Sequence, residues 1–303
     1  MNIFNIKYDD FILNISKYDK YLSNNNILLR QVIANKDNQL LKELILNLEK
    51  YFAFACEVLN SSYDESQVNN IRHANIRNIN VTTLNLIRDT LTLLKQFSIY
   101  GVNALVRMII ENTVTVIALE TNDIDTSEKY YEWQIQNQYK YMKSLDETMK
   151  SENKTEEFIN NYEKCKTEHL LFSQKYKDNN LFKNDYGWAY KVINKDIESS
   201  IYPSFNQLVK YTFPILETFI IELNNYIHST SLLVYNEQLD KISNGELGIK
   251  DIYKKIFTLI TMSIDTITSS HFNLIKEQKQ NISLEDINKI NGYYVDKIMS
   301  LNT

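Results

Sequence analysis

The fold is decided by the stretch "TTLNLIRDTLTLLKQFSIYGVNALVRMIIENTVTVIALETN", Thr82–Asn122, the longest apolar-rich part of the chain. Its Leu and Ile residues follow helical spacing, which is typical of a buried helix, and Ser98 to Gly101 interrupt the pattern. Only five glycines and two prolines occur in 303 residues, which leaves few residues for the tight turns of sheets. We therefore predict an all-α protein with this stretch at the centre of its core.

Helical periodicity continues on both sides of this stretch. A helix is expected from Asp37, placed as its N-cap, to about Ser62, whereas the polar residues Val68–Asn80 are expected to connect elements or form a short helix. Further helices are expected at 127–149 with Thr126 or Ser127 as cap, at 152–176, after Pro214, at 249–280, and at 283–301 behind the capping sequence "SLED". The result is a bundle of roughly eight to ten helices.

The organisation predicted along the chain has three regions. An N-terminal helical region covers 1–81, the helical core covers 82–240, and C-terminal helices at 241–303 pack on the core to form one compact unit. Lys177–Pro203 contains Gly187, Trp188 and several turn-forming residues, so it is expected to be a loop with a short helix. Loops of this length are often functional.

Composition excludes several classes of protein. The formal net charge of -5 argues against a surface that is basic throughout, although a local basic groove remains compatible with it. Cys56 and Cys165 are too few for a disulfide framework, and the N-terminus lacks the pattern of a signal peptide. No uninterrupted apolar run of about 18 residues occurs, so no membrane span is predicted. We expect a cytoplasmic protein.

One histidine lies in an unusual context. In "NNYIHSTSLLVY", Asn224–Tyr235, His228 follows Tyr226 and precedes a run of hydroxyl residues inside an otherwise apolar, helix-like segment. A buried imidazole requires hydrogen-bond partners, and its near-neutral pKa suits a general acid or base. His228 is therefore either a catalytic residue or a hydrogen-bonded packing residue.

A pair of opposite charges lies within the central stretch. Arg107 and Glu111 are four residues apart in "ALVRMIIENTV", so they share one face of a helix and are expected to pair. Their apolar neighbours predict partial burial. Such a pair marks a functional site or serves as a structural ion pair, and the sequence favours neither reading.

Other candidate groups carry weaker signals. Trp188 with Tyr186 and Tyr190 either lines a substrate pocket or anchors the loop to the bundle. Cys165 and His169 share a helix face, but no second ligand pair accompanies them, so no metal site is predicted. The motifs GxGxxG, GxxxxGK[ST], HExxH and GxSxG are missing, and no cofactor is expected.

Taken together, the Arg-x-x-x-Glu in a long apolar helix, the Trp-containing stretch after two amphipathic helices and the late "YIHST" resemble an uncharacterised bacterial family, domain of unknown function 5677. The resemblance covers about Leu84–Tyr235. That family is similar to the HEPN-like helical superfamily of toxins and phage-defence proteins, whose nuclease members cleave RNA without a metal. In those members an arginine precedes the catalytic histidine, with four to six residues between the two.

This sequence departs from the nuclease pattern, because Ile221, Glu222 and Leu223 stand upstream of His228 where arginine is required. We hypothesise instead that Arg107 reaches His228 across the bundle and supplies the missing cation from the central helix, and that Glu111 orients either group. In this reading His228 is the acid or base, and Arg107 binds phosphate. Trp188, Tyr186 and Tyr226 are the candidate substrate-binding residues.

Two functions follow as expectations. The first is a HEPN-like protein of stress or phage defence, a toxin or effector that cleaves RNA or binds a nucleotide. The alternative is a non-catalytic interaction or scaffold protein with a buried Arg-Glu-His network and a protein partner. A homodimer is expected in addition, because one side of Ile249–Gln280 is rich in Ile and Thr and suits packing against a second copy.

Overall fold

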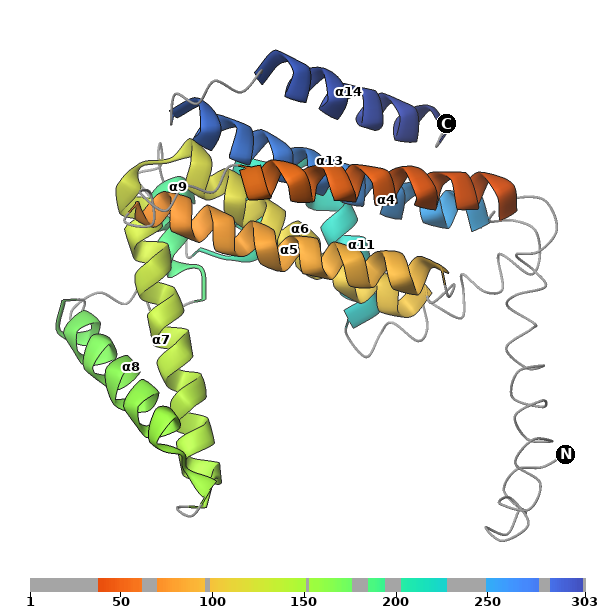
Figure 1. The fold of residues 1–303 in the computed structure, drawn as a ribbon. Helices are drawn as coiled ribbons and strands as arrows, with labels where there is room; N and C mark the ends of the chain where they lie inside the picture. Colours follow the sequence, from red (N-terminus) through yellow and green to blue (C-terminus); the bar gives the residue numbers. More distant parts are fainter. Residues whose placement is uncertain are drawn as a thin grey trace, which may run out of the picture.

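The predicted all-α bundle is confirmed. The computed structural model describes residues 38–61, 70–95, 99–150, 153–175, 185–193, 203–227, 249–277 and 284–301. Within these ranges the chain forms ten α-helices and two short 3₁₀ helices and no strand (Figure 1). The helices are α4 (Asn38–Ser61), α5 (Ile71–Lys95), α6 (Ile99–Thr121), α7 (Ile124–Thr148), α8 (Glu156–Lys175), η5 (Gly187–Ala189), α9 (Tyr190–Ile193), α10 (Phe205–Thr212), η6 (Pro214–Leu216), α11 (Glu217–Ile227), α13 (Ile249–Glu277) and α14 (Leu284–Leu301).

The central stretch is helical, as its apolar spacing predicts, and it forms parts of two antiparallel helices, α5 and α6, an arrangement that the sequence analysis did not predict. α5 ends at Lys95 and α6 begins at Ile99, close to the predicted interruption. α6 packs against α5, α10, α11 and α13, and it contributes fully buried residues such as Val106, Ile109 and Ile110 to the core. Among the described residues, Gly101–Thr121 is the one stretch long and apolar enough to cross a membrane, a test that a buried core helix also passes.

Two further helices complete the bundle. α13 lies along α4 and α6, and Thr113 of α6 donates a 2.9 Å hydrogen bond to Ser263 of α13 in the interior. The apolar side of α13 that was expected to meet a second copy is therefore covered by helices of the same chain. α14 packs outside α4 and α13 (Figure 1).

From Ile71 onward, the polar segment before the central stretch is helical, which the sequence analysis left open. These residues form the first turns of α5. They can do so because the polar side chains of the segment bond to neighbouring helices. Asn75 donates to the Ser127 carbonyl at 2.9 Å, and Asn80 donates to Ser270 Oγ at 2.9 Å. These tertiary hydrogen bonds satisfy the amides and make the helix compatible with burial.

The predicted cap of α7 is wrong by a few residues. Asp123, not Thr126 or Ser127, is the N-cap, and its carboxylate accepts from the Thr126 backbone N–H at 3.0 Å and from Thr126 Oγ1 at 2.9 Å. A carboxylate satisfies the free N–H groups of the first turn and interacts favourably with the helix dipole. The caps expected at Asp37 and Ser283 lie outside the described residues.

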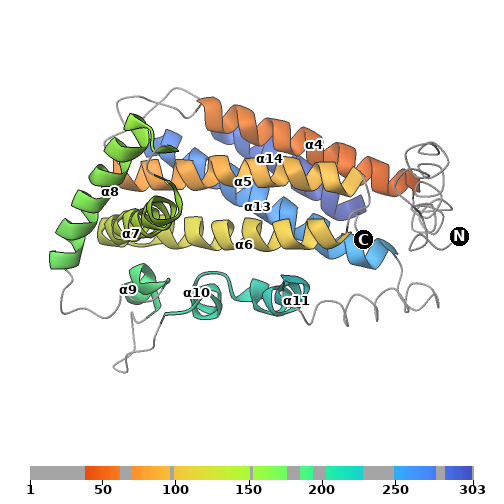
Figure 2. The same ribbon diagram turned by 90° about the horizontal axis from the view of Figure 1, so that it is seen from below.

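A short layer of helices covers the other side of α6. Figure 2 shows α9, α10 and α11 in a row beneath that helix. Pro214 begins the 3₁₀ turn that leads into α11, as expected for a proline in the first turn of a helix. α7 and α8 form an antiparallel hairpin that projects from one end of the bundle (Figures 1 and 2).

Candidate functional site

The Arg107–Glu111 pair forms on α6 as predicted. One terminal nitrogen of the Arg107 guanidinium lies 3.2 Å from Glu111 Oε2. The two partners differ in exposure, since the Arg107 side chain is 12% exposed and the Glu111 side chain is 40% exposed. The carboxylate can therefore turn to water, whereas the guanidinium depends on its neighbours in the protein.

Two aromatic residues from the covering layer complete this cluster. The Tyr186 hydroxyl donates a hydrogen bond to Glu111 Oε1, and the Phe205 ring lies against the guanidinium, 4.0 Å from its Cζ. The ring centroids of Tyr186 and Phe205 are 5.7 Å apart. Ser204 caps α10 and so fixes Phe205 as the first residue of that helix. We call Arg107, Glu111, Tyr186 and Phe205 the Arg107 cluster.

Burial governs the electrostatics of the Arg107 cluster. Desolvation lowers the pKa of Arg107 and Glu111 raises it, but an arginine remains charged because its ordinary pKa is above 12. Burial, followed by the nearby Glu111 carboxylate, raises the pKa of Tyr186. Tyr186 is therefore a neutral hydrogen-bond donor at physiological pH, and the cluster holds one cation, one anion and one hydroxyl donor.

Trp188 lies in the interior next to the Arg107 cluster. Its ring is 1% exposed and meets Tyr130 of α7 edge-on, with centroids 4.9 Å apart. The indole Nε1 is buried without a hydrogen-bond partner. Burial raises the pKa of Tyr130 to about 12. Trp188 therefore anchors its segment to α7 in this conformation, and contact with a substrate requires that segment to move.

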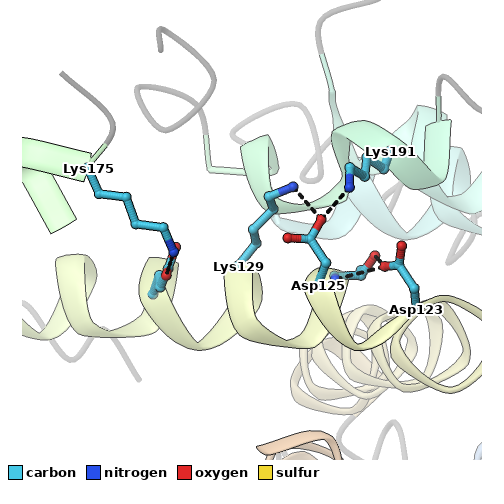
Figure 3. A network of polar contacts seen from close by, with 7 residues as sticks. Asp123, Asp125, Lys129, Lys175 and Lys191 are labelled. Carbon is cyan, nitrogen blue, oxygen red and sulfur yellow. Dashed lines mark hydrogen bonds and ion pairs between the residues drawn. The ribbon is translucent and has the colours of Figure 1, made fainter. Parts of the chain in front are cut away.

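Ion pairs hold the segment around Trp188 and the hairpin in place (Figure 3). Asp125 of α7 accepts from Lys129 at 2.7 Å and from Lys191 of α9 at 2.5 Å. Hydrogen bonds from these lysines lower the pKa of Asp125. Further along α7, Lys175 at the end of α8 pairs at 2.6 Å with Glu132, whose side chain is nearly buried. α7 is thereby joined at one end to α9 of the covering layer and further along to α8, its partner in the hairpin.

His228 and Tyr226 cannot be placed against the Arg107 cluster. His228 lies outside the described residues, and Tyr226 belongs to the last turn of α11 but its side chain is not among those described. α11 packs against α6 and ends at Ile227, directly before His228. The meeting of Arg107 and His228 across the bundle therefore stays a prediction.

The remaining histidines lie on other helices. His73 of α5 and His271 of α13 are buried, and desolvation lowers the pKa of His271 to about 4. His169 of α8 stacks on Tyr139 at 4.2 Å. Among the described residues, no group of three or more His, Cys, Asp or Glu side chains is placed to hold a metal ion.

The comparison with family models matches residues 74–242 to the Family of unknown function (DUF5677). The chain belongs to this family. No curated protein matches the chain, and no solved structure matches it either. The DUF5677 part contains the whole Arg107 cluster together with Tyr130, Trp188 and the position of His228, whereas α4, α13 and α14 lie outside it. The Arg107 cluster is thus built entirely from the family's own segment.

Sequence reasoning missed two members of this DUF5677 site. Phe205 covers one face of the Arg107 guanidinium, and Tyr130 packs against Trp188. The one local signal for Phe205 is its place directly after the N-cap Ser204, and Tyr130 stands in an ordinary amphipathic pattern. Both contacts are tertiary, so helical periodicity does not reveal them.

Proposed function

We propose that this DUF5677 protein is a cytoplasmic bacterial HEPN-like effector of stress or phage defence, which binds an RNA or nucleotide phosphate at the Arg107 cluster and cleaves RNA without a metal. The observation that carries the proposal is an arginine side chain that is 12% exposed and that shares its carboxylate partner with a tyrosine hydroxyl. Desolvated cations and paired titratable groups of this kind occur preferentially at functional sites.

Exchange of anions explains how the Arg107 cluster would bind a phosphate. Glu111 is the more exposed partner, so it can swing into water when a phosphate oxygen takes its place on Arg107. A guanidinium matches two phosphate oxygens through parallel N–H donors, and such charge-assisted bonds are stronger than neutral ones. Tyr186, released from Glu111, then offers its hydroxyl to a further phosphate oxygen.

His228 is assigned the proton transfers in this proposal. As a general base it removes the proton of a ribose 2′-hydroxyl, whose oxygen attacks the adjacent phosphorus. The P–O5′ bond breaks, the leaving oxygen takes a proton from water, and His228 returns its proton to solvent, so the products are a 2′,3′-cyclic phosphate and a 5′-hydroxyl. Arg107 stabilises the charge that develops on the phosphate oxygens, while Trp188 and Tyr226 are candidates for contact with the bases.

Cleavage of mixed cellular RNA in excess EDTA tests this proposal. Purified wild type is compared with His228→Ala and Arg107→Met on a denaturing gel. Arg88→Ala serves as a matched control, because Arg88 is an exposed arginine on α5 that pairs with the neighbouring Asp89. We expect wild type and Arg88→Ala to cleave RNA equally, and we expect loss of either His228 or Arg107 to reduce cleavage by about a hundredfold or more.

Two outcomes would overturn the catalytic assignment. The first is intact RNA with wild-type protein across many RNA pools. The second is cleavage that His228→Ala and Arg107→Met leave unchanged, because it would arise from a contaminating nuclease or from another site. Circular dichroism of each variant separates a loss of activity from a loss of folding.

A second candidate function, a non-catalytic interaction protein, is supported by a different observation. Arg107 already has contacts with Glu111 and Phe205 inside the chain, and Trp188 is almost completely buried. In this reading the cluster fixes the covering layer on α6, and the protein acts through its surface. In this reading neither the wild-type protein nor Arg107→Met binds or cleaves RNA. The substitution changes only the stability of the protein, which it lowers.

A further inference from the structure

The α7–α8 hairpin is the part of the described structure that projects furthest from the bundle. Figures 1 and 2 both show α8 as its outermost element, and α8 packs chiefly on α7. Its inward side holds aromatic contacts, with Tyr139 stacked on Tyr162 at 6.1 Å and on His169 at 4.2 Å. Cys165 is the one buried residue of this helix. Within the described residues, the outer side of α8 therefore faces away from the bundle.

One exposed stripe on that outer side carries a distinct pattern. Ile159, Glu163, Lys166 and Leu170 are spaced by four, three and four residues, so they follow one face of the helix. Ile159 is 46% exposed and Leu170 is 53% exposed, so both apolar side chains are open to contact with a partner. Between them, Lys166 lies 3.1 Å from Glu163 in an exposed pair. We call these four residues the α8 stripe.

The α8 stripe is complementary to itself when the helix is reversed. Read from the N-terminus it is apolar, acidic, basic, apolar, and its centre lies between Glu163 and Lys166. If two copies of α8 lie antiparallel across a two-fold axis at this centre, Glu163 of each copy faces Lys166 of the other. Ile159 of each copy then faces Leu170 of the other.

We propose that α8 is a dimerisation surface on which a second copy of this chain binds antiparallel through the α8 stripe. A two-fold interface needs one patch that is complementary to itself, and the stripe meets this requirement in both its charges and its apolar residues. When the dimer forms, the internal Glu163–Lys166 pair of each chain is broken, and two such pairs form between the chains.

This assignment is independent of the proposed function and differs from the surface expected on α13. The apolar side of α13 is occupied within the chain by α4, α6 and α14. α8 lies inside the DUF5677 segment but away from the Arg107 cluster. Substitutions in the α8 stripe are therefore expected to change the association of the protein without altering the cluster directly.

Charge reversal tests the two-fold pairing. Sedimentation velocity over a concentration series is measured for wild type, Glu163→Lys, Lys166→Glu and the double reversal. Each single substitution puts two like charges opposite one another twice per dimer, and we expect it to weaken association by about tenfold or more. The double reversal restores both opposite-charge pairs and should dimerise like wild type. An equimolar mixture of the two single variants should form heterodimers, because each supplies the charges that the other lacks.

Two neighbouring leucines provide a matched control. Leu170 belongs to the α8 stripe, whereas Leu171 is 62% exposed and lies about 100° further around the helix. Leu170→Asp should give a monomer, and Leu171→Asp should keep the wild-type dimer. Circular dichroism checks that each variant remains helical. A wild type that stays monomeric at every concentration overturns the proposal, and so does an equal effect of the two leucine substitutions. The same conclusion follows if the mixture of charge variants forms no heterodimer.

Discussion

Replacing Glu111 with leucine is expected to destabilise the protein more than replacing Arg107 with methionine, although both substitutions remove the same ion pair. The reason is the unequal burial of the partners, since the Arg107 side chain is 12% exposed and the Glu111 side chain is 40% exposed. Leucine at 111 removes an acceptor from two sheltered donors, the guanidinium of Arg107 and the hydroxyl of Tyr186. Methionine at 107 leaves Glu111 with Tyr186 and with water.

The magnitudes follow from counting these groups. A sheltered donor that loses an acceptor costs about 1–3 kcal/mol, so the loss of Glu111 from two such donors should lower the free energy of unfolding of Glu111→Leu by about 2–6 kcal/mol. Arg107→Met keeps an apolar stem against Phe205 and loses an ion pair with a partly exposed partner. Its cost should be about 1 kcal/mol or less. The double substitution removes the sheltered cation together with its carboxylate and should be more stable than Glu111→Leu alone by about 1 kcal/mol or more.

Urea unfolding followed by far-ultraviolet circular dichroism measures all three variants against wild type. The order of stability should be wild type, Arg107→Met, the double variant and then Glu111→Leu. If Arg107→Met is the most destabilised variant, or if the two single effects add in the double variant, the reasoning from unequal burial is refuted.

Three further predictions use the same structure. Trp188→Ala should cost about 3–5 kcal/mol in urea unfolding, because Trp188 is fully packed, and a cost below about 1 kcal/mol would contradict its anchoring role. Burial raises the pKa of Asp265, with a hydrogen bond from Asn291 opposing, so the folded state binds this proton more tightly than the unfolded state. The resulting stability is present below the ordinary aspartate pKa of about 4 and is lost as pH rises through the raised pKa, so Asp265→Asn should flatten melting temperature against pH in that window. Cys165 is buried and Cys56 only partly, so a thiol reagent should modify Cys56 first, and equal rates in the native protein would be inconsistent with this packing.

Periodicity and composition were sufficient to predict the all-α class and most of the long helices. The scarcity of glycine and proline excludes most sheets, and the Thr82–Asn122 stretch forms parts of α5 and α6 with nearly the expected break. The start of α5 could not be predicted in this way. Its buried asparagines bond to partners on α7 and α13 that are distant in the sequence. The sequence pattern of the segment is therefore polar and does not indicate that the segment is buried.

The candidate site shows the same division. The Arg107–Glu111 pair follows from a spacing of four residues on one helix, and it forms. Tyr186 was named as an aromatic residue of the loop, but its hydrogen bond to Glu111 and the stacking of Phe205 on Arg107 join segments that are far apart along the chain. Local spacing contains no information on such contacts. His228 stays a prediction from its sequence context.

The phosphate contact of Arg107 is the central claim of this account, and RNA binding as a function of salt tests it most directly. Fluorescence anisotropy with a single-stranded RNA oligonucleotide in EDTA compares His228→Ala, which is not expected to cleave, with the double variant Arg107→Met/His228→Ala. Loss of one phosphate contact should weaken binding and reduce the slope of log affinity against log salt concentration by about 0.7. Equal affinities and equal slopes for the two proteins would contradict the claim and leave Arg107 as a structural residue.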